Sequence, residues 1–370
     1  MRDSSIANNT IVTGMTRIVP IMLAGGKGER FWPMSRIARP KQFLRLDGTD
    51  RSLLQATADR LLPLANWDSM FVITGAHTSE GVKSQLPSIP ERNILLEPQG
   101  RDTASAVAVA TLEISKRFGG DAVCGFFPVD HTTDDISLYC DTLAAGVELA
   151  DSQKAIVTLG ITPLYPSTAH GYIEKGAFAG HYSAGCVKDA PAYKVCRFTE
   201  KPDEATAERF IDSGNYYWNS GMFLSPAGTM LTEFKKHAPE IIDPLTSQGI
   251  DAYSHLPKIS IDYAVMEKTD HAYILPVEFS WPDLGNWNAI EKFWKNDSDN
   301  VELCNHLGLD TKESILYSTD SEELIVTIGL DNVVIVRDGN ATLIVKKDRT
   351  NDIKKVVKMI NADDSLRRFL

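Results

Sequence analysis

Cysteines are few in this sequence, and they lie far apart. There are five among 370 residues, an odd number, and no two form a C-x-x-C pair. This pattern argues against a disulfide framework or a zinc site and favours free thiols in the reducing cytoplasm. Long apolar stretches are missing too, and residues 1–16 are polar, without the apolar core of a signal peptide. We therefore expect a cytoplasmic protein that has no membrane segment and begins with a flexible tail at residues 1–16.

The sequence also lacks an excess of positive charge. Its formal net charge is −11 at pH 7, which argues against nonspecific binding to nucleic acid or to anionic membranes. A hydrophobic fraction of 43% and a charged fraction of 24% are ordinary for a globular enzyme. Because 370 residues are many for a single core, we expect one large domain and a smaller one.

One segment, residues 21–43, is nevertheless rich in glycine and in cations. It reads IMLAGGKGERFWPMSRIARPKQF, so an apolar run leads into three glycines that are followed by Arg30 and Lys41. Glycines let backbone N–H groups approach phosphate oxygens, Arg offers two oxygens a planar fork, and Lys adds a mobile charge. A Walker loop is absent because no Ser or Thr follows Lys27, and a Rossmann fingerprint is absent because Phe31 replaces its third glycine. We call residues 21–43 the signature segment and interpret it as a polyphosphate-binding loop.

Short apolar runs alternate with helical patterns through the first 160 residues. This alternation predicts an α/β fold with a doubly wound, mainly parallel sheet and helices on both faces. Pro20 lies inside the first expected strand and lacks a backbone donor, so we expect the ladder to be interrupted there. The expected strands are Ile18–Ala24, Met70–Thr74, Ile94–Leu96, Val123–Phe127 and Ile156–Leu159, and the clearest helices are Ser52–Leu62 and Thr103–Phe118.

The pattern changes twice further along the chain. Between about 165 and 285, we expect strands at 171–174, 195–200 and 217–224 and helices near 228–237 and 262–268. After about 290, we expect three short strands at 324–328, 332–337 and 341–346, followed by a helix from about 352 to 360. We therefore expect a large domain at 17–290, with halves at about 17–160 and 161–290, and a small β-rich domain at 291–370.

The signature segment resembles that of the sugar-nucleotide pyrophosphorylases, also called sugar-1-phosphate nucleotidyltransferases. Its variant with Phe31-Trp32-Pro33-Met34-Ser35 and Lys41-Gln42-Phe43 resembles the mannose-1-phosphate guanylyltransferases in particular, and the resemblance extends over residues 17–360. It implies a Rossmann-like nucleotidyltransferase domain followed by a partial β-helix. It also implies a Mg²⁺-dependent enzyme, a homodimer, that converts GTP and mannose 1-phosphate into GDP-mannose and pyrophosphate.

The resemblance assigns the nucleotide half of the site to several segments. Arg30 and Lys41 are expected to stabilise the triphosphate and the departing pyrophosphate. The loop Glu97–Ala104 is expected to contact the base, although from the residues alone Asp102 or Thr103 is also a candidate helix N-cap. The residues expected to bind the nucleotide are Leu23, Ala24, Gly25, Gly26, Gly28, Glu97, Arg101, Thr103 and Asp130.

The metal and the sugar phosphate are assigned to later strands. A lone Asp after a strand, such as Asp130, is also typical of a turn or a helix cap. In the family pattern Asp130 and Asp283 hold one Mg²⁺, an ion that takes one or two carboxylates together with phosphate oxygens and water. Arg30, Lys41, Asp130 and Asp283 are therefore the expected catalytic residues. The expected sugar-phosphate-binding residues are Gly171, Glu174, Glu200, Lys201 and Asn219, with Lys201 on the phosphate.

Two alternatives stay open at this point. One is a related transferase that uses another nucleotide or hexose, such as a glucose 1-phosphate uridylyl- or thymidylyltransferase. Trp32 and Gln42-Phe43 favour the guanylyl activity over that one. The other is a non-catalytic regulatory protein that binds nucleotide sugars. Such a protein often loses the metal carboxylates or the loop arginine, and all of them are present here.

Overall fold

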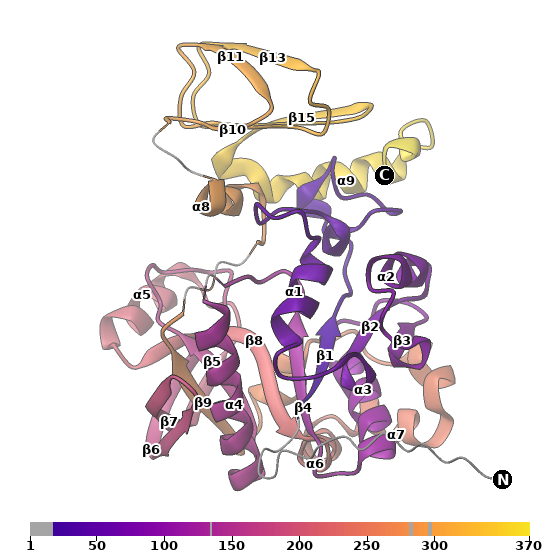
Figure 1. Cartoon of the computed structure of the whole chain (residues 1–370), viewed down its shortest axis with the longest axis vertical. Coiled ribbons are helices and arrows are strands. Elements are labelled where there is room, and N and C mark those ends of the chain that lie inside the picture. Colours follow the sequence, from indigo (N-terminus) through magenta and orange to yellow (C-terminus); the bar gives the residue numbers. More distant parts are fainter. Residues whose placement is uncertain (1–17, 134, 280, 282–283, 295–297) are drawn as a thin grey trace, which may run out of the picture.

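The computed structural model describes residues 18–370 except 134, 280, 282–283 and 295–297. The expected tail at 1–16 and the expected metal ligand Asp283 therefore lie outside the described residues. Figure 1 shows a large α/β unit with a smaller β-rich unit above it, and the last helix, α9 (Ile353–Ala362), lies between the two. No helix in the described part of the chain combines the length and the apolarity that crossing a bilayer requires.

The large unit is built on a nine-stranded sheet in the order β3-β2-β1-β4-β8-β5-β9-β7-β6. The four strands β3, β2, β1 and β4 are parallel to one another, whereas β8 is antiparallel to both β4 and β5. The predicted α/β class is confirmed, with the parallel pairing concentrated in the first half. The strands are β1 (Ile18–Leu23), β2 (Phe71–Gly75), β3 (Ile94–Glu97), β4 (Val123–Pro128), β5 (Ile156–Ile161), β6 (Tyr172–Ala184), β7 (Val187–Thr199), β8 (Tyr216–Pro226) and β9 (Ala272–Val277).

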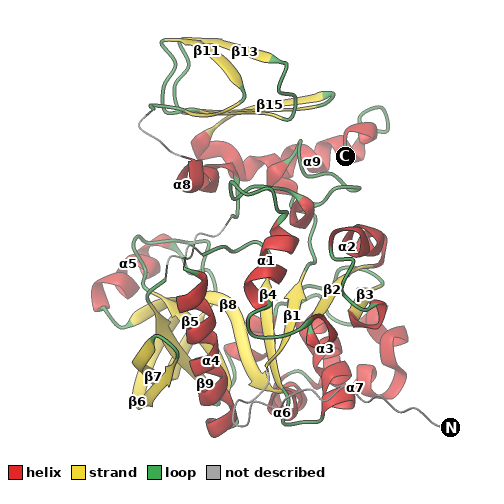
Figure 2. Cartoon of the chain, viewed as in Figure 1, coloured by secondary structure: helices red, strands yellow, loops and turns green. Residues whose placement is uncertain are grey.

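Helices cover both faces of this sheet (Figure 2), as the alternating pattern predicts. One apolar cluster joins the sheet to α1, α2 and α4, and a second joins its other face to α3, α6 and α7. Helix α3 has the bounds expected from the sequence. The helices of the large unit are α1 (Leu53–Leu61), α2 (Ser79–Gln85), α3 (Thr103–Phe118), α4 (Ile136–Gln153), α5 (Glu204–Ser213), α6 (Ala227–His237) and α7 (Pro239–Gln248), and α8 (Glu291–Trp294) follows them.

Two local expectations need correction. The ladder between β1 and β4 runs through Pro20, which pairs with Gly125, so the expected interruption of that ladder is wrong. The ladder with β2 begins only at Ile21, directly after Pro20, so on that side of β1 the expectation is correct. The helix expected near 262–268 is a short π-helix at Asp262–Met266.

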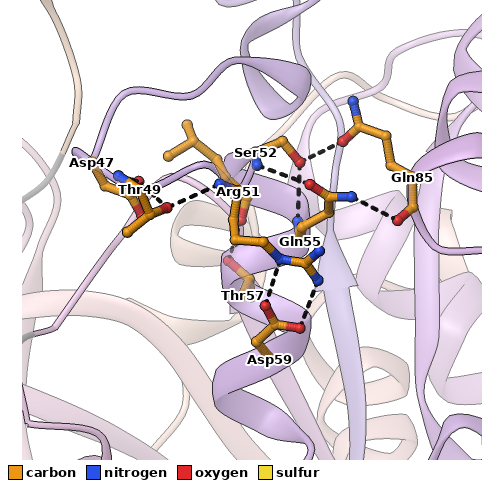
Figure 3. Close-up of polar contacts among 9 residues, drawn as sticks. Asp47, Thr49, Arg51, Ser52, Gln55, Thr57, Asp59 and Gln85 are labelled. Carbon is orange, nitrogen blue, oxygen red and sulfur yellow. Dashed lines mark hydrogen bonds and ion pairs between the residues drawn. The ribbon is translucent and has the colours of Figure 1, made fainter.

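The start of α1 shows why this helix begins where the sequence predicts. The Ser52 hydroxyl accepts a hydrogen bond from the Gln55 N–H, and the Gln55 side chain accepts one from the Ser52 N–H (Figure 3). This reciprocal capping box satisfies two donors at the helix terminus that have no partner within the helix. Gln55 also donates to the backbone of Gln85, so the cap ties the end of α2 to the start of α1.

The small unit is a short β-solenoid. Strands β10, β12 and β14 form a parallel ladder to which β15 adds antiparallel, and β11 and β13 form a second parallel pair. The predicted partial β-helix is confirmed, and its three predicted strands are β13, β14 and β15. The bounds are β10 (Val301–Leu303), β11 (Asn305–Leu309), β12 (Ile315–Ser318), β13 (Leu324–Ile328), β14 (Val333–Asp338) and β15 (Ala341–Lys346).

A third apolar cluster joins the signature segment to the small unit. Phe31, Trp32 and Met34 are buried in it, and so are Ile353 and Val357 of α9. The indole N–H of Trp32 also donates to the Phe369 carbonyl at 2.9 Å. The predicted phosphate-binding loop is therefore packed between the sheet and the small unit, which together with α9 is called the C-terminal unit below.

Candidate active site

A cavity of about 870 Å³ opens at the carboxyl ends of the parallel strands. It lies at the end of β1, which has β2 on one side and β4 on the other, so the strand order reverses there; this is the usual ligand position in an open α/β sheet. Cations contribute much of its wall. The charged residues that line it are Lys27, Glu29, Arg30, Lys41, Glu97, Asp102, Asp130, Lys258, Lys354 and Lys358.

Hydrogen bonds hold the glycine loop of the signature segment in place. The buried Gln42 side chain and the Thr74 hydroxyl both donate to the Ala24 carbonyl, at 2.9 and 3.0 Å. The Ser35 hydroxyl donates to the Lys27 carbonyl at 2.6 Å. Gly28 has a positive φ of 62°, a conformation that glycine adopts at little cost. The loop is thus pre-shaped with its glycines on the cavity wall.

Arg30 and Lys41 connect this loop to two other segments. The Arg30 guanidinium donates to the Gly285 carbonyl at 2.6 Å, and the Lys41 ammonium pairs with the Asp130 carboxylate at 2.9 Å. All four residues line the cavity. Three of the four expected catalytic residues, Arg30, Lys41 and Asp130, therefore lie around one space, and Asp283 lies outside the described residues.

Asp130 has the environment of a carboxylate that stays ionised. Burial alone would raise its pKa, but the charges of Lys41 and His131 lower the pKa of this carboxyl below its usual range. The backbone at this position is fixed too, because Leu284 donates to the Asp130 carbonyl at 3.1 Å and the buried Arg60 donates to the His131 carbonyl at 2.6 Å. Arg60 is a supporting residue that the sequence motifs do not reveal.

Part of the cavity wall is built from the end of β3 and the start of α3. The Glu97 carboxylate accepts a hydrogen bond from the buried Tyr253 hydroxyl. Burial raises the pKa of Glu97, and the bond from Tyr253 opposes that shift. Asp102 is the N-cap of α3, so one of the two sequence alternatives is correct for that residue, while Thr103 lines the cavity.

Most of the expected nucleotide-binding residues line the cavity. Leu23, Gly25, Gly26, Gly28, Glu97, Thr103 and Asp130 do so. Ala24 is buried behind the wall, where its carbonyl anchors the loop. Arg101 is not among the lining residues, and its guanidinium donates to the Ser254 carbonyl.

Four of the five expected sugar-phosphate residues form a second cluster. Lys201 pairs with Glu200, and Asn219 donates its backbone N–H to the Gly171 carbonyl at 2.8 Å. A Cβ atom on Gly171 would lie 2.5 Å from a Glu200 carboxylate oxygen and 3.3 Å from the Asn219 Cβ, so a larger residue here would displace the Glu200 side chain. The fifth, Glu174, lies within β6, three residues after Gly171, and accepts a hydrogen bond from the Tyr216 hydroxyl at 3.0 Å.

Asp262 belongs to this second cluster, although no sequence motif drew attention to it. Its carboxylate accepts a hydrogen bond from the Asn219 amide at 3.1 Å. Burial and the charge of Glu200 raise the pKa of Asp262 to about 7, against the opposing charge of Lys201. From sequence alone, an Asp at the start of a helical pattern is read as a cap, so its role in the cluster is invisible there.

Aromatic rings connect the second cluster to the cavity. The His131 ring lies 4.4 Å from that of Trp281, and the His170 ring lies 5.6 Å from Trp281 and 4.9 Å from Trp218. His131 follows Asp130 in the chain and Trp218 precedes Asn219, so this chain of rings indicates that Asp130 and Asn219 lie on the same edge of the sheet. The antiparallel pairing of β4 with β8 agrees, because its register runs from Val123 opposite Pro226 to Phe126 opposite Phe223, so the carboxyl end of β4 points towards the amino-terminal half of β8.

One carboxylate on the cavity wall, that of Asp130, suits a hard divalent cation that is bound together with a nucleotide. Asp130 provides an ionised oxygen ligand on the cavity wall. Within the described residues, no three His, Cys, Asp or Glu side chains gather as a ready-made metal site. Mg²⁺ commonly uses one or two carboxylates and completes its shell with phosphate oxygens and water, so the Asp130 carboxylate fits Mg²⁺ when a polyphosphate is also bound.

The C-terminal helix α9 adds lysines that the sequence motifs missed. Lys354 and Lys358 line the cavity beside the signature segment. Their spacing of four residues puts them on one face of the helix, which was visible in the sequence. The sequence does not show that this face meets the cavity, because that contact depends on how the two units pack against each other.

Each of the two units matches a known protein family. The nucleotidyl transferase family profile matches residues 19–300, and that of the MannoseP isomerase/GMP-like beta-helix domain matches residues 304–360. The xanthan biosynthesis protein XanB of Xanthomonas campestris pv. campestris (strain B100) is 38% identical over 363 residues, which cover 94% of this chain and 74% of that protein.

Two further proteins are similar over nearly the whole chain. The mannose-1-phosphate guanylyltransferase ManC of Salmonella typhimurium is 35% identical over 370 residues, covering 95% of this chain and 75% of that protein. A solved structure described as a mannose-1-phosphate geranyltransferase from Thermus thermophilus superposes with a TM-score of 0.82 at 33% identity, covering 93% of this chain and 99% of that one. From the matched profile, the shared fold and these relatives, we conclude that the chain belongs to the nucleotidyl transferase family.

Proposed function

We propose that this chain is a mannose-1-phosphate guanylyltransferase, which transfers GMP from GTP to mannose 1-phosphate. The observation that carries the proposal is the meeting of Arg30, Lys41 and Asp130 around one cavity, with the cluster of Lys201 and Asn219 on the same edge of the sheet. Such a layout can hold a nucleotide and a sugar phosphate side by side. Relatives over 30% identical are named for this activity.

The proposed reaction is a direct displacement. An oxygen of the sugar 1-phosphate forms a bond to the α-phosphorus of GTP, and the bond from that phosphorus to the β-phosphate oxygen breaks. Pyrophosphate leaves with the electron pair. The attacking phosphate is already ionised at neutral pH, so the step needs no general base, and catalysis reduces to positioning and charge neutralisation.

Each described residue has a proposed part in this step. Arg30 and Lys41 neutralise the triphosphate and the departing pyrophosphate, and Lys201 holds the phosphate of the sugar. Asn219 contacts sugar hydroxyls, because its amide both donates and accepts. Asp130, with Asp283, would hold Mg²⁺, which supplies charge neutralisation and alignment of the phosphates when bound.

The test is a substrate panel. Four nucleoside triphosphates are each combined with mannose 1-phosphate and glucose 1-phosphate, pyrophosphate release is measured, and the nucleotide sugar is identified by mass. We expect GTP with mannose 1-phosphate to have the highest kcat/KM. A preference for UTP or dTTP with glucose 1-phosphate would indicate the related uridylyl or thymidylyl activity. Binding of GDP-mannose without pyrophosphate release from any pair would indicate a regulatory protein.

A matched pair of variants tests the site itself. Arg30→Ala should lower turnover about 10²–10³-fold, the usual effect of deleting one group that stabilises transition-state charge. Arg51→Ala is the control, because Arg51 forms a forked ion pair with Asp59 at the surface and does not line the cavity. Turnover of Arg30→Ala within a few-fold of Arg51→Ala would contradict the assignment.

A further inference from the structure

Helix α9 presents two lysines to the cavity from outside the nucleotidyl transferase unit. Lys354 and Lys358 line the same space as Arg30 and the glycine loop. They belong to the C-terminal unit, beyond the matched nucleotidyl transferase region that ends at residue 300. The cavity wall is therefore completed by a segment that follows the transferase unit in the chain.

The position of α9 over the cavity is fixed by packing. Its apolar side buries Ile353, Val357 and Ile360 against the cluster that contains Phe31 and Trp32. These buried positions and the two lysines lie on neighbouring faces of the same helix. In Figure 1 the yellow α9 lies across the indigo segment that carries the glycine loop. The lysines consequently approach the loop on a rigid element.

A second set of contacts fixes the C-terminal unit against the signature segment. Arg39 forms an ion pair with Asp338 at 2.7 Å, and Arg36 donates to the Asp338 carbonyl at 2.9 Å. Asp338 ends β14 and is nearly buried. Arg36 and Arg39 of the signature segment thus bind the solenoid. The cations of the segment that line the cavity are Lys27, Arg30 and Lys41.

The lysines of α9 sit among like charges. Burial and the neighbouring Arg30 lower the pKa of Lys354, Lys201 and Lys358 add to the effect, and the nearby Glu29 opposes it. Lys354 therefore lies in the field of the cation proposed for the triphosphate and of the one proposed for the sugar phosphate. Like charges held close together are unfavourable, and a polyphosphate anion would relieve that repulsion.

We propose that Lys354 and Lys358 bind the β- and γ-phosphates of the nucleotide and the pyrophosphate formed from them. The C-terminal solenoid unit then supplies part of the active site. This inference rests on the proposed nucleotidyl transfer. The β- and γ-phosphates are the favoured ligands because they carry most of the charge of the triphosphate, and because Lys354 lies close to Arg30, the residue proposed to neutralise the departing pyrophosphate.

The test compares ligands that have the β- and γ-phosphates, here called the outer phosphates, with a ligand that lacks them. Binding of GTP, GMP and inorganic pyrophosphate to the full chain is measured by calorimetry for Lys354→Ala, Lys358→Ala, the double variant and Lys354→Arg. The control is Lys355→Ala, on the same helix but pairing with Asp352 and absent from the cavity wall. All variants are first compared by thermal unfolding.

We expect each alanine variant to bind GTP and pyrophosphate about tenfold more weakly, as for loss of one charge-assisted contact at a partly exposed site. Binding of GMP should change less than twofold. Lys354→Arg should keep most of the affinity, and Lys355→Ala should match the wild type. GTP and pyrophosphate affinities within twofold of the wild type in the double variant would overturn the inference.

These outcomes separate the inference from the proposed function. If the wild type releases pyrophosphate from no pair of substrates, the proposed function fails. The difference between triphosphate and monophosphate binding still decides whether α9 holds the outer phosphates. If the wild type is active but the double variant keeps its KM for GTP and its KM for pyrophosphate in the reverse reaction, the inference fails alone.

Discussion

Gly28→Ala should disable the site by pushing two of its parts apart. Gly28 has a φ of 62°, and a Cβ atom added there would lie 2.2 Å from the Cβ of Lys41 and 3.1 Å from its Cα and backbone N. Ordinary van der Waals contact between such atoms begins at a separation of about 3.4 Å. The glycine loop and the backbone of Lys41 would therefore have to separate by about 1.2 Å.

The size of the effect follows from that displacement. Lys41 reaches Asp130 with a side chain that is only 12% exposed, so it has little room to compensate. A misplacement of about 1 Å in a catalytic constellation can cost on the order of 10²-fold in rate. For stability, the left-handed backbone costs about 1–2 kcal/mol for alanine, and the overlap adds about 1–3 kcal/mol.

The control separates the backbone cost from the overlap. Gly329 has a nearly equal φ of 64° and no atom within 4 Å of an added Cβ, and it follows β13 in the solenoid. Gly329→Ala should lose only the backbone contribution and keep wild-type turnover. Thermal unfolding and pyrophosphate release are measured for both variants. If Gly28→Ala turns over within a few-fold of Gly329→Ala, contact between the loop and Lys41 does not set the geometry of the site.

Three further predictions concern groups around the site. The pKa of Asp262 is raised to about 7 in the folded state, so the wild type loses folding stability as pH rises from about 4 towards 7. Asp262→Asn cannot titrate at this position. Its stability relative to the wild type should therefore increase between about pH 4 and 8, by up to about 4 kcal/mol. Parallel melting curves of the two proteins across this range would contradict it. Tyr253→Phe should cost about 1–3 kcal/mol in a denaturant titration, because Glu97 is left buried without its donor, and Tyr253→Phe with unchanged stability would refute that pairing. Ile353→Ala should cost about 2–5 kcal/mol and weaken GTP binding, since Ile353 anchors α9; a normal GTP affinity in a destabilised variant would show that α9 does not reach the nucleotide.

Local sequence patterns predict the transferase unit well because its elements are locally consistent. The apolar runs Ile18–Ala24 and Val123–Phe127 become neighbouring parallel strands, and Thr103–Phe118 becomes a helix with those bounds. The glycine loop, Arg30 and Lys41 lie together because they are close in the chain and fold over a single strand end. Such features depend on short-range periodicity and on the edge of the sheet at which parallel strands end.

Other features depend on long-range packing, and the sequence patterns do not reveal them. Glu174 and Gly171 belong to one predicted strand, yet Glu174 in β6 contacts Tyr216 of β8, whereas Gly171 precedes β6 and lies beside Glu200. Asp262 reaches Asn219 only through the pairing of distant segments. The cytoplasmic location, the homodimer and the domain limits at 290 and 160 stay predictions.

The signature segment has two structural roles, and they explain its composition. The glycines, Arg30 and Lys41 face the cavity, whereas Phe31, Trp32 and Met34 are buried against the C-terminal unit. The same 23-residue stretch therefore shapes a phosphate site on one side and docks a second unit on the other. Because that unit returns α9 to the cavity, any loss of packing around Phe31 should weaken binding of the outer phosphates even when every cation of the loop is intact. The apolar half of the motif is thus as much a condition for the site as its charged half.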